Sequence, residues 1–143
     1  KLVDETKRIC AIYRARLAPV RLTRLAHRFI TNLQLPLQPG DSYQVYLHKL
    51  VDVPDDAPQA VASFFQRFEL VDVESGYRVI LTAAQEPTSP QGPPSVILDV
   101  DAYTHTNLLP RDEQLWVILE RLRELKNRTF FGSITEQAAE FYE

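Results

Sequence analysis

The sequence contains no methionine, one cysteine, one tryptophan and only four glycines. Because Cys10 stands alone, no disulfide can form within the chain, and we interpret Cys10 as a small apolar residue. The glycines are scattered, which excludes a glycine-rich loop of the kind that binds phosphate. No apolar run approaches the roughly 18 residues that a membrane-spanning helix needs, so we expect no contact with a membrane.

The absence of methionine, with Lys1 as the first residue, predicts that the chain is a piece of a longer polypeptide. Its 143 residues suit a single domain, residues 1–143, because domains most often contain about 100–150 residues. A surface that the rest of the polypeptide normally covers would then be open to self-association. The net charge of −3 argues, on bulk charge alone, against a nucleic-acid-binding protein.

Residues 95–103, S-V-I-L-D-V-D-A-Y, give the strongest strand signal, because they are rich in β-branched residues and follow a proline-rich loop. A long strand is predicted at residues 20–35. Residues 60–73 end as an alternating strand, which the turn Glu74-Ser75-Gly76 connects to a return strand at residues 77–84. The sequence therefore predicts four strands.

Helices are predicted on either side of these strands. Apolar residues at helical spacing predict a helix over residues 2–16. After the central strand, Thr106 or Asn107 is the predicted cap of a second helix, with Pro110 in its first turn. This helix is expected to end within residues 127–132.

Two shorter helical segments complete the pattern. The capping box Ser133-x-x-Glu136 predicts a last helix, and Asp41-Ser42 predicts a cap for one turn that extends to Leu47. Helices at the two ends of a run of strands are typical of an α+β fold. We expect a four-stranded, mainly antiparallel sheet with an N-terminal helix and two C-terminal helices packed on it.

Two carboxylates, Asp99 and Asp101, lie on one face of the central strand, because side chains alternate along a strand. Arg24 and Arg28 share one face of the long strand before it. We therefore expect ion pairs in which the carboxylates meet Arg24 and Arg28, or Arg78, across neighbouring strands. The same arginines and aspartates are the candidate binding residues if this face takes a ligand.

A second interpretation of the carboxylates is catalytic. Asp99 and Asp101 could bind a divalent metal in a metal-dependent hydrolase, with His105 as a further ligand, because hard cations prefer carboxylate oxygens. Metal sites usually recruit ligands that are distant in sequence, and this pattern is too local to define one. We favour structural pairing, with no metal and no cofactor.

The arginines allow a third interpretation. Arg21, Arg24 and Arg28 could form a phosphate or nucleic-acid patch. The break between the first helix and the long strand spreads the nearby positive charges over different faces, so a salt-bridged distribution is favoured. His27 lies on the apolar face of the same strand and is predicted to be a core histidine.

Three short segments carry a resemblance to a known family: R-L-A-H-R-F-I-T-N-L at 24–33, L-D-V-D-A-Y at 98–103 and F-F-G-S-I-T-E at 130–136. With these, the chain resembles the C-terminal half of a sporadically distributed family of uncharacterised bacterial proteins. The asparagine that the family carries after its aromatic-isoleucine pair falls on Thr31 here, with Asn32 next to it.

The resemblance implies a bacterial, cytoplasmic protein, and it names no reaction. It also implies that Arg24, Arg28, Asp99 and Asp101 belong together, in agreement with the ion pairs expected from alternation. We interpret the chain as a non-enzymatic domain that binds a protein partner or shapes an assembly, with self-association as one form of this. The hydrolase and the phosphate or nucleic-acid site remain the alternatives.

Overall fold

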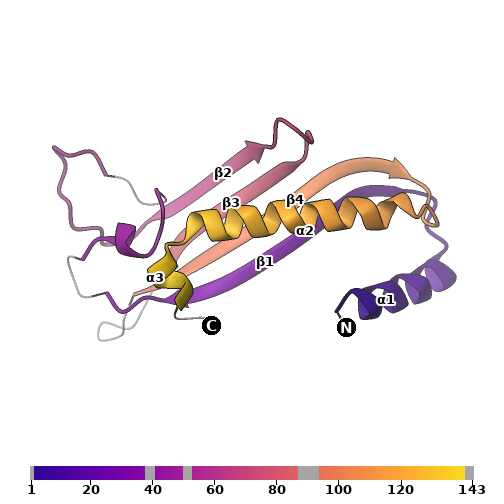
Figure 1. Cartoon of the computed structure of the whole chain (residues 1–143), viewed down its shortest axis with the longest axis horizontal. Helices are drawn as coiled ribbons and strands as arrows, with labels where there is room; N and C mark the ends of the chain where they lie inside the picture. The colour runs from indigo at the N-terminus through magenta and orange to yellow at the C-terminus, as the bar shows by residue number, and fades with distance from the viewer. Residues whose placement is uncertain (1, 38–40, 50–52, 87–93, 141–143) are drawn as a thin grey trace.

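The computed structural model of the chain describes residues 2–37, 41–49, 53–86 and 94–140. In chain order, its elements are α1 (Leu2–Leu17), β1 (Leu22–Gln34), the 3-10 turn η1 (Tyr43–Val45), β2 (Phe65–Val71), β3 (Arg78–Glu86), β4 (Ser95–Leu108), α2 (Gln114–Ser133) and α3 (Glu136–Ala139). The strands form one four-stranded antiparallel sheet in the order β1-β4-β3-β2. The N-terminal helix and the C-terminal helix pack on it, which confirms the predicted α+β fold (Figure 1).

The central strand β4 divides the sheet into two faces. Its even-numbered residues Val96, Leu98, Val100 and Ala102 are completely buried and belong to the same apolar cluster as Leu122 of α2. Burying a leucine or valine side chain completely contributes about 1.5–3 kcal/mol, so this row holds α2 against the sheet. The odd-numbered residues of β4 point to the opposite face, which α2 does not cover.

The hairpin between β2 and β3 forms where the sequence predicts it. Asp72 accepts hydrogen bonds from both the amide and the hydroxyl of Ser75, and the amide of Gly76 donates to the carbonyl oxygen of Asp72 at 2.7 Å. Gly76 has a φ of +72°, a left-handed conformation that glycine adopts without steric cost. The turn of η1 is likewise confirmed, with Ser42 as its cap.

The start of α2 differs from the prediction. Thr106 and Asn107 do not cap a helix but extend β4 to Leu108, because the ladder with β1 continues, past a register shift, to the pair of Leu22 and Leu108. The Thr106 hydroxyl donates to the carbonyl oxygen of Leu22. The helix begins at Gln114, whose amide donates to the Asp112 side chain at 2.9 Å.

The end of α2 also corrects the prediction, because the helix continues through residues 127–132 to Ser133. The hydroxyl of Ser133 donates to the carbonyl oxygen of Thr129 at 2.7 Å and so belongs to α2. The cap of α3 is Thr135, which accepts from the amide of Ala138 at 3.3 Å. The predicted capping box therefore begins two residues too early.

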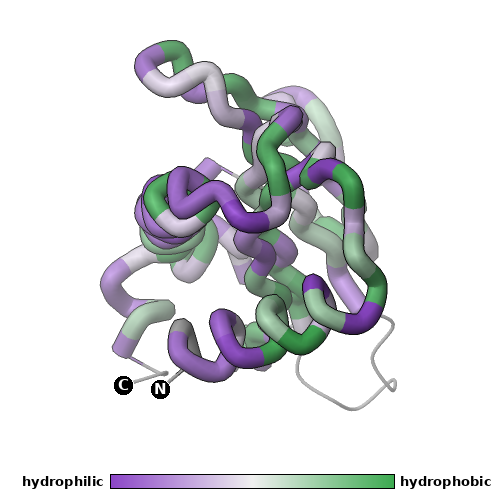
Figure 2. Tube along the Cα trace, turned by 90° about the vertical axis from the view of Figure 1, so that its right-hand side faces the viewer, coloured by the Kyte–Doolittle hydropathy of each residue, from purple (hydrophilic) through white to green (hydrophobic). Residues whose placement is uncertain are grey.

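Helix α1 lies beside β1 at one end of the sheet (Figures 1 and 2). Its attachment is polar: Arg14 donates from Nη1 to the carbonyl oxygen of Pro110 at 2.9 Å, and the Lys7 ammonium lies 5.3 Å from the centre of the Trp116 ring. From residue 4 onward, its large apolar side chains are about half exposed or more. These residues are Ile9, Ile12, Tyr13 and Leu17.

The predicted surface loop at residues 85–94 overlaps β3, which includes Gln85 and Glu86, and residues 87–93 lie outside the described part of the chain. Within the described ranges, no helix has both the length and the apolar character needed to span a bilayer.

Candidate functional site

The face of the sheet opposite α2 brings the four predicted site residues together. In the register of β1 and β4, Arg24 is opposite His105, and Arg28 is opposite Asp101. Asp99 and Asp101 point to the same face as both arginines, as alternation predicts. We call this surface the open face.

Two ion pairs join β1 to β4 on the open face. Arg28 binds Asp99 through two hydrogen bonds, from Nε to Oδ1 at 2.8 Å and from Nη2 to Oδ2 at 2.6 Å. Arg24 donates from Nη2 to Oδ2 of Asp101 at 2.7 Å. The aspartate side chains are only 17% and 16% exposed, whereas the arginines are 55% and 41% exposed. The carboxylates therefore lie in the sheet surface, and the arginines cover them.

The polar network continues across the sheet to its other edge. The Arg24 guanidinium lies 4.5 Å from the centre of the Tyr103 ring, and the Tyr103 hydroxyl donates to Oε1 of Glu69 at 2.9 Å. Arg78, the alternative partner for the aspartates, instead donates to the same Glu69 oxygen at 2.8 Å. Hydrogen bonds from Arg78 and then from Tyr103 lower the pKa of Glu69, so its carboxylate remains ionised.

These contacts decide what the aspartates can do chemically. Asp99 binds a guanidinium through both oxygens, whereas Asp101 binds one through Oδ2 and its Oδ1 atom is buried without a hydrogen-bond partner among the described residues. The hydrogen bonds to Asp99 raise the pKa of Arg28 above its usual value. Within the described ranges, no cluster of three or more His, Cys, Asp or Glu side chains has a geometry suited to a metal ion. The arrangement is that of a cross-strand ion-pair row.

The arginines of the predicted phosphate patch are also occupied. Arg21 donates from Nη1 to the carbonyl oxygen of Asn107 at 3.1 Å, and Arg24 and Arg28 bind aspartates. These bonds use only one or two of the five N–H groups of each guanidinium, so a phosphate at Arg24 or Arg28 would compete chiefly with the negative charge of the bound aspartate.

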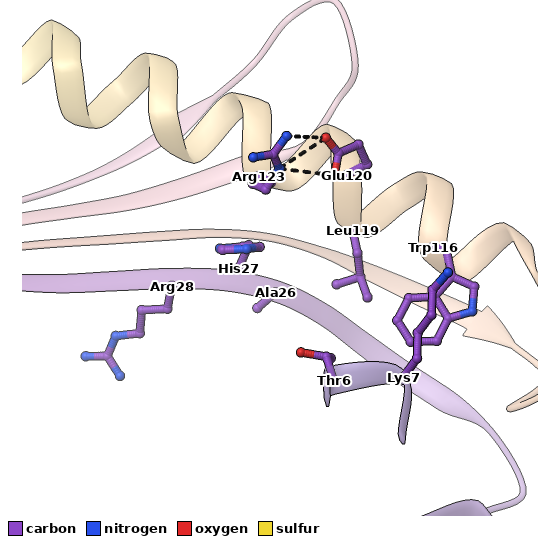
Figure 3. Close-up of a pocket in the computed structure, with 9 residues that line it drawn as sticks. All are labelled: Thr6, Lys7, Ala26, His27, Arg28, Trp116, Leu119, Glu120 and Arg123. Carbon is purple, nitrogen blue, oxygen red and sulfur yellow. Dashed lines mark hydrogen bonds and ion pairs between the residues drawn. The ribbon is translucent and has the colours of Figure 1, made fainter. Parts of the chain in front are cut away.

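A cleft between α1, β1 and α2 was not predicted from the sequence. It has a volume of about 500 Å³, and Figure 3 shows Leu119 and Trp116 of α2 on one side and Thr6 and Lys7 of α1 on the other. His27 points from β1 toward α2, and its Nδ1 atom is buried without a hydrogen-bond partner in the described part of the chain. These residues are far apart in sequence, so only the fold could bring them together.

Burial lowers the pKa of His27, and the positive charges of Lys126 and Arg123 lower it further. The predicted core histidine is therefore partly buried and favours its neutral form.

The edge of the sheet formed by β2 was also missed. Figure 1 shows β2 as the outer strand at the side away from β1, with neither long helix over it. Its apolar side chains are exposed on both faces: Phe65 by 69%, Phe68 by 40%, Leu70 by 42% and Val71 by 54%. Edge strands of native proteins often carry prolines, bulges or charged side chains that hinder pairing with another strand. Within residues 65–71, β2 has no proline and no bulge, and its charged side chains are Arg67 and Glu69.

The hydrogen bonds of the hairpin show which backbone groups of β2 are free. The amide of Asp72 donates to the carbonyl oxygen of Tyr77 at 2.8 Å, and the amide of Gln85 donates to that of Phe64 at 3.0 Å. Bonded and non-bonded positions alternate in an antiparallel ladder, so the backbone N–H and C=O groups of the even-numbered residues of β2 point to β3. The N–H and C=O groups of the odd-numbered residues therefore point to the free edge. These are Phe65, Arg67, Glu69 and Val71.

Comparisons with protein-family models, with curated proteins and with solved structures found no match. The resemblance to the bacterial family therefore stays an expectation.

Proposed function

We propose that this domain is a non-enzymatic assembly module that binds a protein strand along the free edge of β2. The observation that carries the proposal is the free edge of β2, where backbone groups of the odd-numbered residues point outward and apolar side chains are exposed on both faces of the strand. Strand addition uses these two features together: the main-chain hydrogen bonds supply affinity, and the side-chain pattern supplies specificity.

The ion-pair row supports this proposal indirectly. It engages the carboxylates of Asp99 and Asp101, which a metal-dependent hydrolase would need as ligands. It also engages Arg24 and Arg28, which a phosphate or nucleic-acid site would need as donors. Because Tyr103 and Arg78 extend the row to Glu69 of β2, the row instead holds the edge strand in place for pairing.

A synthetic strand tests the proposal without knowledge of the natural partner. The probe is a short peptide of alternating valine and threonine, with a glutamate placed opposite Arg67 and a lysine opposite Glu69. We expect saturable binding, with the largest backbone amide shifts in the NMR spectrum at Arg67, Glu69 and Val71. The same peptide with proline at alternate positions lacks the necessary N–H groups and is expected not to bind.

The matched protein variant is Arg67→Pro, which removes one N–H group from the free edge and leaves the even-numbered bonds to β3 intact. We expect this variant to fold and to lose peptide binding. Peptide shifts that are absent from β2, or that persist unchanged in folded Arg67→Pro, contradict the proposed function.

A further inference from the structure

We propose that the strand bound by β2 is β2 of a second copy of this chain, paired antiparallel about a two-fold axis at Phe68. This inference rests on the proposed function and names the partner. Its evidence is the sequence of β2, Phe65-Gln66-Arg67-Phe68-Glu69-Leu70-Val71, read against an inverted copy of itself. Symmetric homodimers require such a self-complementary surface.

The backbone allows this pairing. In an antiparallel pair centred on Phe68, Arg67 is opposite Glu69 of the second copy, and Phe65 is opposite Val71 of the second copy. All of these are odd-numbered residues whose N–H and C=O groups point to the free edge. Each facing pair can therefore exchange two hydrogen bonds, while Phe68 faces its own copy at a position without hydrogen bonds.

The side chains select this register over its neighbours. Centred on Phe68, the dimer places Arg67 opposite Glu69 of the second copy twice, and apolar Phe65 opposite apolar Val71 twice. Moving the axis to Arg67 places arginine opposite arginine, and moving it to Glu69 places glutamate opposite glutamate. Like charges directly opposite each other destabilise a strand pair, so only the register centred on Phe68 combines long overlap with matched charges.

The two charged side chains that this pairing needs, Arg67 and Glu69, already lie on the open face of the single chain. The hydrogen bonds from Arg78 and Tyr103 fix the Glu69 carboxylate on the open face. Arg67 lies two positions earlier on the same face, where its charge acts on Glu69 without a hydrogen bond between them. The dimer would supply Arg67 with a carboxylate and join two sheets into one continuous sheet.

Sedimentation velocity over a range of protein concentrations tests the inference by charge exchange. We expect a concentration-dependent dimer for the native chain. Arg67→Glu places glutamate opposite glutamate, and Glu69→Arg places arginine opposite arginine, so each variant alone should dimerise at least about tenfold more weakly. An equimolar mixture of the two restores opposite charges at every facing position and is expected to recover the dimer.

A second pair of variants avoids Glu69 and its bonds within the chain. Phe65→Glu and Val71→Lys change exposed side chains that face each other only in the dimer. Each alone should weaken the dimer, and their mixture should form heterodimers. The control is Arg16→Glu on exposed α1, which makes the same charge change as Arg67→Glu away from β2 and is expected to leave the dimer unchanged.

The outcomes separate this inference from the proposed function. A native chain that remains monomeric while the valine-threonine peptide binds to β2 overturns the inference and leaves strand addition with another partner. A dimer that persists in Arg67→Glu, or that is lost only in Arg16→Glu, also overturns it. Failure of the peptide to bind counts against the proposed function itself.

Discussion

Arg28 lies directly opposite Asp101 in the register of β1 and β4, yet it forms both of its hydrogen bonds with Asp99. The Arg24 side chain extends in the same direction along β1, over the Tyr103 ring, and binds Asp101. The two arginines therefore bind the two aspartates diagonally. This offset places the aromatic ring of Tyr103 beneath the Arg24 guanidinium and its hydroxyl beside Glu69.

The pairing of Arg24 with Asp101 predicts a measurable coupling. In a double-mutant cycle with Arg24→Ala and Asp101→Asn, urea unfolding should give a coupling energy of about 0.5–1 kcal/mol in favour of the native pair. The matched control couples Arg24→Ala with Glu120→Gln, whose carboxylate is bound by Arg123 on α2. Additive effects in the Arg24–Asp101 cycle would mean that the ion-pair row does not stabilise the sheet.

His27 predicts the acid side of the stability profile. Burial, followed by the charges of Lys126 and Arg123, holds its pKa below the usual value of 6.5, against a smaller opposing effect of Glu120. The unfolded chain therefore binds a proton at a higher pH than the folded chain does. The stability that depends on neutral His27 should be complete above about pH 6.5, and the free energy of unfolding should fall as the pH decreases below that value.

The measurement is urea unfolding from pH 7.5 downward. Replacing the histidine in His27→Gln should reduce the slope of stability against pH in this window, whereas Gln44→Ala, at an exposed side chain without a titratable group, should keep the native slope. An unchanged slope in His27→Gln would show that the neutral ring is not a source of the dependence.

Two glycines predict opposite responses to alanine. At Gly76 the φ of +72° is unfavourable for any side chain, so Gly76→Ala should lower the free energy of unfolding by about 1 kcal/mol. Gly132 lies in the last turn of α2 with open space around its Cα, so Gly132→Ala should raise it by about 0.5–1 kcal/mol. Thermal unfolding of both variants checks this, and changes of the same sign would contradict it.

The observed cap of α3 is Thr135, whereas the sequence predicted Ser133, and alanine substitutions distinguish the two. Thr135 accepts from the Ala138 amide and also donates from Oγ1 to the carbonyl oxygen of Val45 at 2.8 Å. Thr135→Ala should therefore cost about 1 kcal/mol. Ser133→Ala, within α2, should cost about 0.5 kcal/mol or less. A larger loss of free energy of unfolding in Ser133→Ala than in Thr135→Ala would indicate that Ser133 is the cap.

Much of the fold could be predicted because alternation and turn chemistry are local properties of the sequence. The apolar row of β4 and the turn at Gly76 are visible in short windows. So was the pairing of Arg24 and Arg28 with Asp99 and Asp101, because strand alternation places each pair on one face. The sequence left Arg78 as an alternative partner, since it contains no information on which strand is next to which.

The remaining features depend on tertiary contacts. Thr106 and Asn107 are good helix caps in isolation, but pairing of β4 with Leu22 of β1 extends the strand through them. The cleft at His27 needs three elements brought together by the fold. The exposed edge follows from the strand order, which makes β2 an outer strand. A signal was present, since Phe65, Phe68, Leu70 and Val71 occupy both faces of one short strand.

Amide hydrogen exchange along β2 tests most directly whether chains join through this edge. At low protein concentration, the outward amides of Arg67, Glu69 and Val71 should exchange quickly, while those of Phe68 and Leu70, bonded to β3, should be protected. At concentrations where the chain associates, the three outward amides should become protected as well. If they continue to exchange quickly in the associated protein, the interface lies elsewhere and the account of β2 is wrong.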